Sequence, residues 1–96
     1  MKKFVIIHYG YETPTQEIQD AWRKWFASIG NRIVDPGNPL GAGREISRAG
    51  TKDLPAGKES LSGYTVINAE SIDEAEKIAK ECPMITSVRV YEAMSM

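Results

Sequence analysis

The 96-residue sequence contains only one cysteine and one histidine, and its opposite charges nearly cancel. A single cysteine, Cys82, cannot form an internal disulfide. One histidine and one distant cysteine give no recognised spacing of metal ligands, so we expect no metal and no other cofactor. A formal net charge of −1 disfavours nucleic acid as a partner, because phosphate binding needs clustered lysine and arginine.

Long apolar runs are also missing. No stretch approaches the roughly 20 apolar residues of a membrane-spanning helix, so we expect no membrane association. The opening MKKFVIIHYGYE has a basic dipeptide, but its apolar run is too short for the core of a signal peptide. These absences predict a cytoplasmic location. The 42% hydrophobic and 26% charged residues are ordinary globular values, and the length predicts a single domain over residues 1–96.

The clearest pattern is a strand, a helix and a strand in the last third of the chain. Tyr64–Asn68 is rich in β-formers. Ser71 and Glu74 have the spacing of a capping box, and Pro83 ends the helix because it has no N–H to donate. Val88–Val90 then predicts a short strand. Within the helix, apolar residues recur at helical spacing: Ile72, Ala75, Ile78, Ala79 and Cys82.

The first third predicts a strand followed by a long helix. Lys3–Tyr9 contains consecutive apolar β-formers, so we expect both faces of this strand to be buried and the strand to be central. Thr13 is the expected N-cap, with Pro14 in the first turn and Gln16 completing a capping box. Gly30 ends the helix. Its apolar stripe, whose aromatic members we expect in the core rather than in a ligand wall, is Ile18, Ala21, Trp22, Trp25, Phe26 and Ile29.

The middle of the chain gives weaker signals. Arg32–Asp35 predicts a short strand, which Pro36 and Pro39 restrict to the edge of a sheet. Arg44–Gly50 is expected to form another short extended piece. Thr51–Ser60 contains a proline and a glycine and predicts an exposed loop.

The order of these elements predicts an α+β fold, the ferredoxin-like βαββαβ sandwich, with two helices on one face of an antiparallel sheet. Its first and third strands would be central. The helices cover only one face, so the second apolar face of the first strand needs another cover. A second copy of the chain is the expected cover, which predicts a homodimer packed through the sheet face.

With these residues in view, the chain resembles the YCII-related family, in particular its DGPF-type branch. The resemblance is greatest in Leu61–Tyr91, where Gly63–Tyr64, Glu70–Ala75 and Cys82–Pro83 stand as in the family. The branch's DGPF tetrapeptide would fall at Thr51–Leu54, where this chain reads TKDL, so it looks like a divergent member. The resemblance implies a dimeric ferredoxin-like α/β barrel. For function it implies little beyond a His-Asp site in some members and, in others, attachment to transcription factors.

His8 is the natural candidate for proton transfer near neutral pH, because an unperturbed histidine titrates there. It alternates with Phe4 and Ile6 and therefore shares their sheet face. Near the end of its strand it would lie beside Ser62 and Tyr64. A cleft between these strand ends and the start of the long helix would make a small-molecule pocket. The alternative is a structural His8, hydrogen-bonded to Tyr64 or to a backbone carbonyl.

Asp35 is the expected partner of His8 in a catalytic pair, as the family's His-Asp site implies. An edge position for Asp35 would, however, place the third strand between the two side chains, about 10 Å apart. The alternative is an aspartate that serves the turn before Pro36. Asn38 and Arg44 flank the same segment and would line the pocket, with Arg44 suited to a carboxylate or phosphate.

We therefore expect a small-molecule-binding domain in which His8 performs any simple acid–base catalysis. The alternative is a non-catalytic protein-interaction or regulatory module that uses its sheet or loop face. The sequence contains no motif that decides between an enzyme and a binding protein, and none that specifies a substrate.

Overall fold

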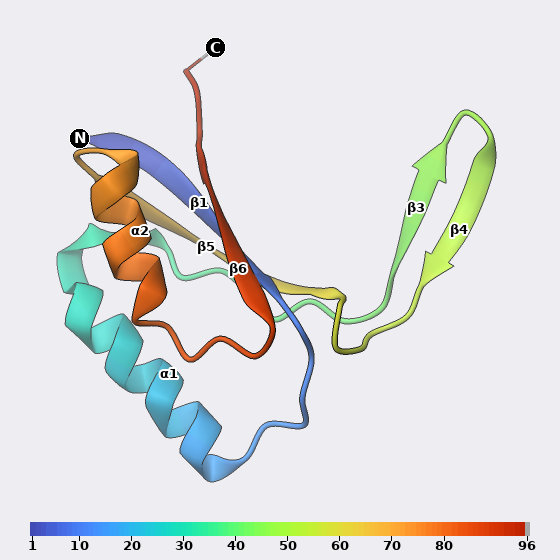
Figure 1. Ribbon diagram of the computed structural model, residues 1–96, viewed down its shortest axis with the longest axis horizontal. Coiled ribbons are helices and arrows are strands. Elements are labelled where there is room, and N and C mark those ends of the chain that lie inside the picture. Colours follow the sequence, from blue (N-terminus) through green and yellow to red (C-terminus); the bar gives the residue numbers. More distant parts are fainter. Residues whose placement is uncertain (96) are drawn as a thin grey trace.

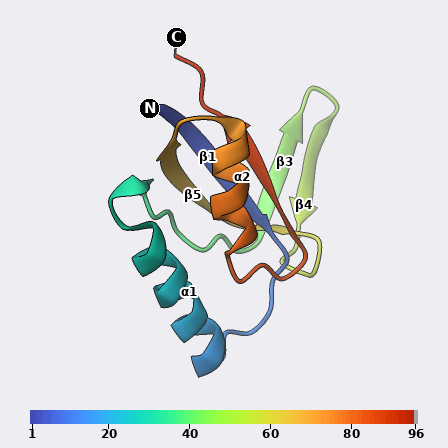
Figure 2. The same cartoon turned by 60° about the vertical axis from the view of Figure 1, so that its left-hand side comes forward.

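The structure is a computed structural model that describes residues 1–95 (Figures 1 and 2). Along the chain, its body consists of β1 (Lys2–Tyr9), α1 (Gln16–Ile29), β2 (Ile33–Asp35), β5 (Leu61–Ala69), α2 (Ile72–Lys80) and β6 (Ser87–Glu92). The four strands form one sheet in the order β2-β5-β1-β6, with every neighbouring pair antiparallel. Both helices lie on the same face of the sheet (Figure 1). This is the expected ferredoxin-like α+β arrangement, with β1 and β5 at its centre.

The pairing of β1 with β5 determines which side chains face the helices. Phe4 lies opposite Ile67, and Ile6 lies opposite Thr65. All four are fully buried, because this face is covered by α1 and α2. His8 follows at the end of the same row. Period-2 alternation therefore delivers the only histidine of the chain to the helix side of the sheet.

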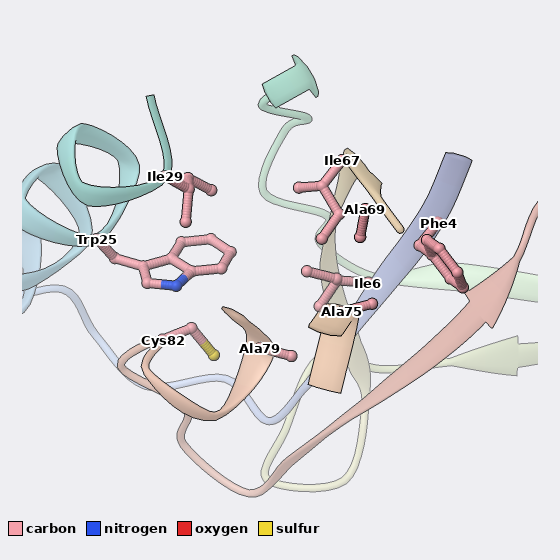
Figure 3. Close-up of a cluster of buried hydrophobic side chains, with 9 residues drawn as sticks. All are labelled: Phe4, Ile6, Trp25, Ile29, Ile67, Ala69, Ala75, Ala79 and Cys82. Atoms are coloured by element: carbon pink, nitrogen blue, oxygen red, sulfur yellow. The ribbon is translucent and has the colours of Figure 1, made fainter. Parts of the chain in front are cut away.

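The hydrophobic core fills the layer between the sheet and the helices (Figure 3). Trp25 of α1 reaches towards α2, where its indole Nε1 donates to the carbonyl of Ile78 at 3.0 Å. This bond satisfies the one polar atom that the buried indole brings. Cys82 packs into the same core, and burial raises the pKa of its thiol to about 11. The thiol is therefore protonated at neutral pH and acts as a small apolar group.

The N-terminus of α1 differs from the prediction. The N-cap is Thr15 rather than Thr13, and the Thr15 hydroxyl accepts from the backbone N–H of Ile18 at 3.2 Å. Pro14 then precedes the cap, where its missing N–H has no consequence. The Gln16 side chain, expected to close a capping box, instead donates to Asp20 one turn later. At the other end, Gly30 adopts a positive φ of 47° and ends the helix as predicted.

The Ser71 cap of α2 follows the prediction, whereas the reciprocal bond of the expected capping box goes to the residue before the cap. The Ser71 hydroxyl accepts from the N–H of Glu74 at 3.2 Å, and the Glu74 carboxylate accepts from the N–H of Glu70 at 3.2 Å. The same carboxylate pairs with Arg32, which lies in the short 3₁₀ helix η1 (Gly30–Arg32) after α1. The start of α2 is thereby joined to the end of α1. No helix within residues 1–95 is long and apolar enough to cross a membrane.

A two-stranded hairpin projects away from the body (Figures 1 and 2). Its strands are β3 (Gly43–Ser47) and β4 (Gly50–Leu54). All ten strand residues are exposed, and we call this hairpin the arm. The predicted loop over Thr51–Ser60 is therefore wrong in its first part, because Thr51 and its neighbours pair with β3. The sequence GTKDL lacks apolar alternation because neither face of the arm packs against the body.

Ile67, at a buried strand position, and Ile46, at an exposed one, give a matched test of this packing. Ile67 is 0% exposed and Ile46, on the arm, is 80% exposed. Ile67→Ala should reduce the free energy of unfolding by about 2–5 kcal/mol through lost burial and a cavity. Ile46→Ala should change it by less than about 0.5 kcal/mol. Urea denaturation measures both, and similar losses in the two variants would contradict the assigned layers.

Candidate functional site

A cavity of about 520 Å³ opens between the N-terminal half of α1 and the adjoining ends of β1 and β5. The segment Pro36–Pro39, which follows the edge strand β2, closes one side. The wall of the cavity also includes His8, Tyr11, Pro14, Ile18, Trp22, Phe26, Gly63, Thr65 and Ile85. A cleft at this place in the fold was expected from the sequence. Its volume lies within the usual range for small-molecule sites.

Aromatic and aliphatic side chains dominate the wall. Trp22 and Phe26, one turn apart on α1, are only partly buried, with ring centroids 5.9 Å apart. We expected both in the core; they pack against it and also line the cavity. Trp25, on the adjacent side of the helix, is the one that enters the core fully. The cavity therefore suits a largely apolar molecule.

His8 is held in the wall by ring contacts. Its imidazole meets Trp22 edge-on, with centroids 5.0 Å apart, and Trp25 in the same manner at 6.0 Å. The residue is 7% exposed. Burial disfavours the charged form and lowers the pKa of His8 from 6.5 to about 4. His8 is therefore neutral at pH 7.

The hydrogen bonds of His8 involve one ring nitrogen only. Nε2 lies 3.0 Å from the hydroxyl oxygen of Thr65, and that hydroxyl donates to the carbonyl of Pro36 at 3.3 Å. Nδ1 is buried and has no hydrogen-bond partner within residues 1–95. Buried polar atoms are usually paired, so this nitrogen is an unmatched hydrogen-bonding position in a residue that lines the cavity.

Tyr64 and Ser62 lie near His8 but do not bond to its ring. Tyr64 pairs with Ile7 in the β1–β5 register, so its side chain lies on the other face of the sheet. Its hydroxyl meets the Asn38 amide Nδ2, which donates at 3.4 Å. The Ser62 hydroxyl donates to the backbone carbonyl of His8 at 3.2 Å. The polar neighbour of the imidazole is Thr65, which we did not single out from the sequence.

Asp35 and Arg44 lie apart from His8. Asp35 pairs with Val66, so β5 separates its strand from β1. Its carboxylate accepts from the N–H of Gly37 at 2.8 Å, the local turn expected of an aspartate before a proline. Arg44 belongs to the exposed arm, where its Nε lies 3.2 Å from the Asp53 carboxylate. Asn38 does line the cavity, and so do Ser62 and Tyr64.

Only the paired strands bring Thr65 and Pro36 to His8. Thr65 is 57 residues from His8 in the sequence, and Pro36 reads simply as a turn residue. The alternation of Gly63 and Thr65 along β5 was a usable signal, since it puts both on the face that carries His8. Within residues 1–95, no three histidine, cysteine, aspartate or glutamate side chains come together as a metal site.

Fold and cavity together define a ferredoxin-like α+β domain with a buried histidine in the wall of an apolar pocket. The chain belongs to the YCII-related family, because the model for the YCII-related domain matches residues 3–96. This confirms the resemblance carried by Leu61–Tyr91. No curated protein matches the chain at a significant level.

Among solved structures, the chain is similar to 5-chloro-2-hydroxyhydroquinone dehydrochlorinase (TftG) from Burkholderia phenoliruptrix AC1100, in complex with 2,5-dihydroxybenzoquinone. The TM-score is 0.60 at 19% sequence identity, over 96% of this chain and 93% of the other. Similarity at this level of identity shows the shared fold alone.

The lowered pKa of His8 predicts a specific pH dependence of stability. The unfolded chain takes up a proton near pH 6.5, whereas the folded chain does so only near pH 4. The stabilisation by neutral His8 is therefore complete above pH 6.5 and is lost as the pH falls towards 4. Since one pKa unit corresponds to about 1.4 kcal/mol, the loss should be roughly 3 kcal/mol.

The control is His8→Gln, which does not titrate. Subtracting its unfolding free energy from that of the wild type at each pH removes the contributions of other ionisable groups, including Glu12 and Arg23 along the same cavity. Chemical denaturation between pH 7 and pH 4 measures the difference. A difference that stays constant over this range would show that His8 is not held neutral by burial.

Proposed function

We propose that this domain binds a small, largely apolar ring compound in the His8 cavity and that His8 acts on it as an acid–base group. The observation that carries the proposal is the buried imidazole in the cavity wall, with Nδ1 left without a partner in the described chain. A polar atom in such a position is matched when a bound molecule supplies the missing hydrogen bond.

The composition of the wall supports a flat and mostly uncharged ligand. Trp22 and Phe26 offer ring faces and edges to a ring compound. The charged lining residues are Glu12 and Arg23, of opposite sign. Arg44, which would suit a carboxylate or phosphate ligand, lies on the arm with Asp53. The neighbour's 2,5-dihydroxybenzoquinone is a flat ring compound, although its acidic hydroxyls ionise below neutral pH, and it serves as a first probe.

The lowered pKa of His8 limits the chemistry it would perform. An imidazole with a pKa of about 4 is a weak base at pH 7 and acts first as a hydrogen-bond acceptor. It would take a proton only from an acidic donor, such as the hydroxyl of an electron-poor ring. Asp35 is bonded within its own turn, so the proposed chemistry rests on His8 without it.

The binding test uses Trp22 as the reporter. Adding 2,5-dihydroxybenzoquinone or hydroquinone should quench the tryptophan fluorescence saturably, because Trp22 lines the cavity. His8→Phe keeps a ring but removes both nitrogens, and it should weaken binding by about tenfold, the effect of one buried hydrogen bond.

The control is Tyr91→Phe, which keeps a ring and removes a polar atom outside the cavity, at an exposed position of β6. Its affinity should equal that of the wild type. Native mass spectrometry of freshly purified protein adds an unbiased search for a retained metabolite. The proposal fails if neither probe saturates and no metabolite is retained, or if His8→Phe and wild type bind equally.

The sheet face opposite the helices supports a homodimer as part of the proposal. The β1–β5 and β1–β6 registers place Val5, Ile7, Val66 and Tyr91 together on this face. No helix of the described chain covers them. A second copy, packed sheet to sheet, would bury this apolar surface.

Disrupting this face should separate the two copies. Wild type should have twice the chain mass in light-scattering measurements at micromolar concentration, and Val5→Asp should have the monomer mass, because a carboxylate would be buried unpaired. Ile46→Asp on the arm is the control and should remain dimeric. A wild-type monomer would refute the dimer without affecting the cavity.

A second candidate function is a non-catalytic interaction module. The observation in its favour is the arm, whose ten strand residues are all exposed, since an isolated two-stranded hairpin is marginal in water. A stoichiometric protein partner that binds wild type, and no longer binds after residues 43–54 are replaced by a short linker, would favour this function over the first.

A further inference from the structure

We propose that Thr65 is a positioning residue that fixes His8 in the tautomer protonated at Nε2, so that Nδ1 is the nitrogen available to a ligand. The first part concerns the chain alone, whereas the second rests on the proposed function of the cavity. Neither Thr65 nor Pro36 carries a chemical signature in the sequence. Their role follows from the direction of the hydrogen bonds.

The direction is determined by Pro36. A backbone carbonyl can only accept, so the single hydroxyl proton of Thr65 is used in the 3.3 Å bond to Pro36. Towards His8, 3.0 Å away, the Thr65 oxygen is then left as an acceptor. Nε2 must therefore carry the proton and donate it. In neutral imidazole the other nitrogen is bare.

The opposite arrangement leaves more groups unpaired. If Thr65 donated to a bare Nε2, its bond to Pro36 would be lost and Nδ1 would carry a buried N–H without a partner in the described chain. An unpaired buried donor is rarer in proteins than an under-used acceptor. The observed contacts thus favour the tautomer protonated at Nε2.

Two glycines bring these groups within reach. Gly37 has a φ of 77°, and a Cβ at this position would lie 1.7 Å from the carbonyl oxygen of Tyr64. The segment after β2 can therefore run directly against β5, beside Thr65. Gly63 pairs with His8, and a Cβ there would lie 3.3 Å from the Asn38 carbonyl oxygen. The close approach of this segment requires a glycine at position 37, whereas a side chain at position 63 would require its neighbour to shift by a few tenths of an ångström.

The assigned tautomer gives the site a preference among ligands. A bare Nδ1 accepts a hydrogen bond, so a ligand that reaches it must bring a donor, such as a ring hydroxyl, a thiol or an N–H. A ring compound of the same shape that carries only acceptors would leave Nδ1 unpaired. Hydroquinone and 1,4-benzoquinone form such a pair of probes, with donors and with acceptors respectively.

The decisive measurement is nitrogen-15 NMR of the imidazole at pH 7, in the free protein. Because His8 is the only histidine in the sequence, the imidazole signals need no residue assignment, and the couplings to the two carbon-bound ring protons distinguish Nε2 from Nδ1. Wild type should show a protonated Nε2 and an unprotonated Nδ1 in a single tautomer. A protonated Nδ1, or the two tautomers in comparable amounts, would overturn the proposal.

Thr65→Val and Thr65→Ser separate positioning from packing. Valine keeps the shape but loses the oxygen, and it should reduce the ratio of the Nε2–H to the Nδ1–H tautomer by about fivefold, the effect of one neutral hydrogen bond. Serine keeps the hydroxyl and should retain the wild-type tautomer. An unchanged ratio in folded Thr65→Val would count against Thr65. Should that variant not fold, the wild-type spectrum still decides.

The two parts of the proposal, and the function beneath it, fail in different ways. An Nε2–H tautomer, with no binding of either probe and no retained metabolite, leaves the assignment of Thr65 intact and refutes the proposed function. Binding of both probes with equal affinity supports the cavity but overturns the preference for donors. Tighter binding of hydroquinone than of 1,4-benzoquinone, lost in Thr65→Val and restored in Thr65→Ser, is the result we expect.

Discussion

The antiparallel pairing of β1 with β5 is the interaction on which the rest of the structure depends. Its register joins Phe4 to Ile67 and Ile6 to Thr65, which assembles the floor of the core. The same register puts His8 and Thr65 on one face and sends Tyr64 to the other. A shift of the register by one residue would move all these side chains to the opposite face of the sheet. The core and the site therefore depend on the same strand register, and a change of register would displace both.

The burial of His8 likewise affects both the stability of the fold and the proposed function. Two indoles and two strands exclude water from the ring, which lowers its pKa to about 4. A histidine in this state does not hold an anion by charge. The site differs in this respect from one built around Arg44, whose guanidinium lies on the exposed arm. Apolar walls with one neutral nitrogen suit the proposed selection of a ligand by shape and by hydrogen-bond direction.

The sequence was most informative where structure depends on neighbouring residues and less informative where it depends on the register between distant strands. The cap of α2 at Ser71 and the end of α1 at Gly30 could be predicted because each is a local contact. Thr13 and Thr15 are equally good caps as isolated residues, and the structure uses the second. β4 carries no apolar alternation because the arm buries nothing. The position of Thr65 beside His8 spans 57 residues and follows only from the strand register.

Gly37 has no functional group, yet its backbone sets the distance between the segment after β2 and the strand beside it. Any side chain there would collide with the Tyr64 carbonyl and push Pro36 away from Thr65. In a mutational screen for the proposed activity, substitutions at position 37 would therefore reduce activity as strongly as substitutions of a reacting residue, although no atom of Gly37 takes part in a reaction. The extent of the site therefore depends on where two backbone segments can come into contact, as well as on which residues carry reactive atoms.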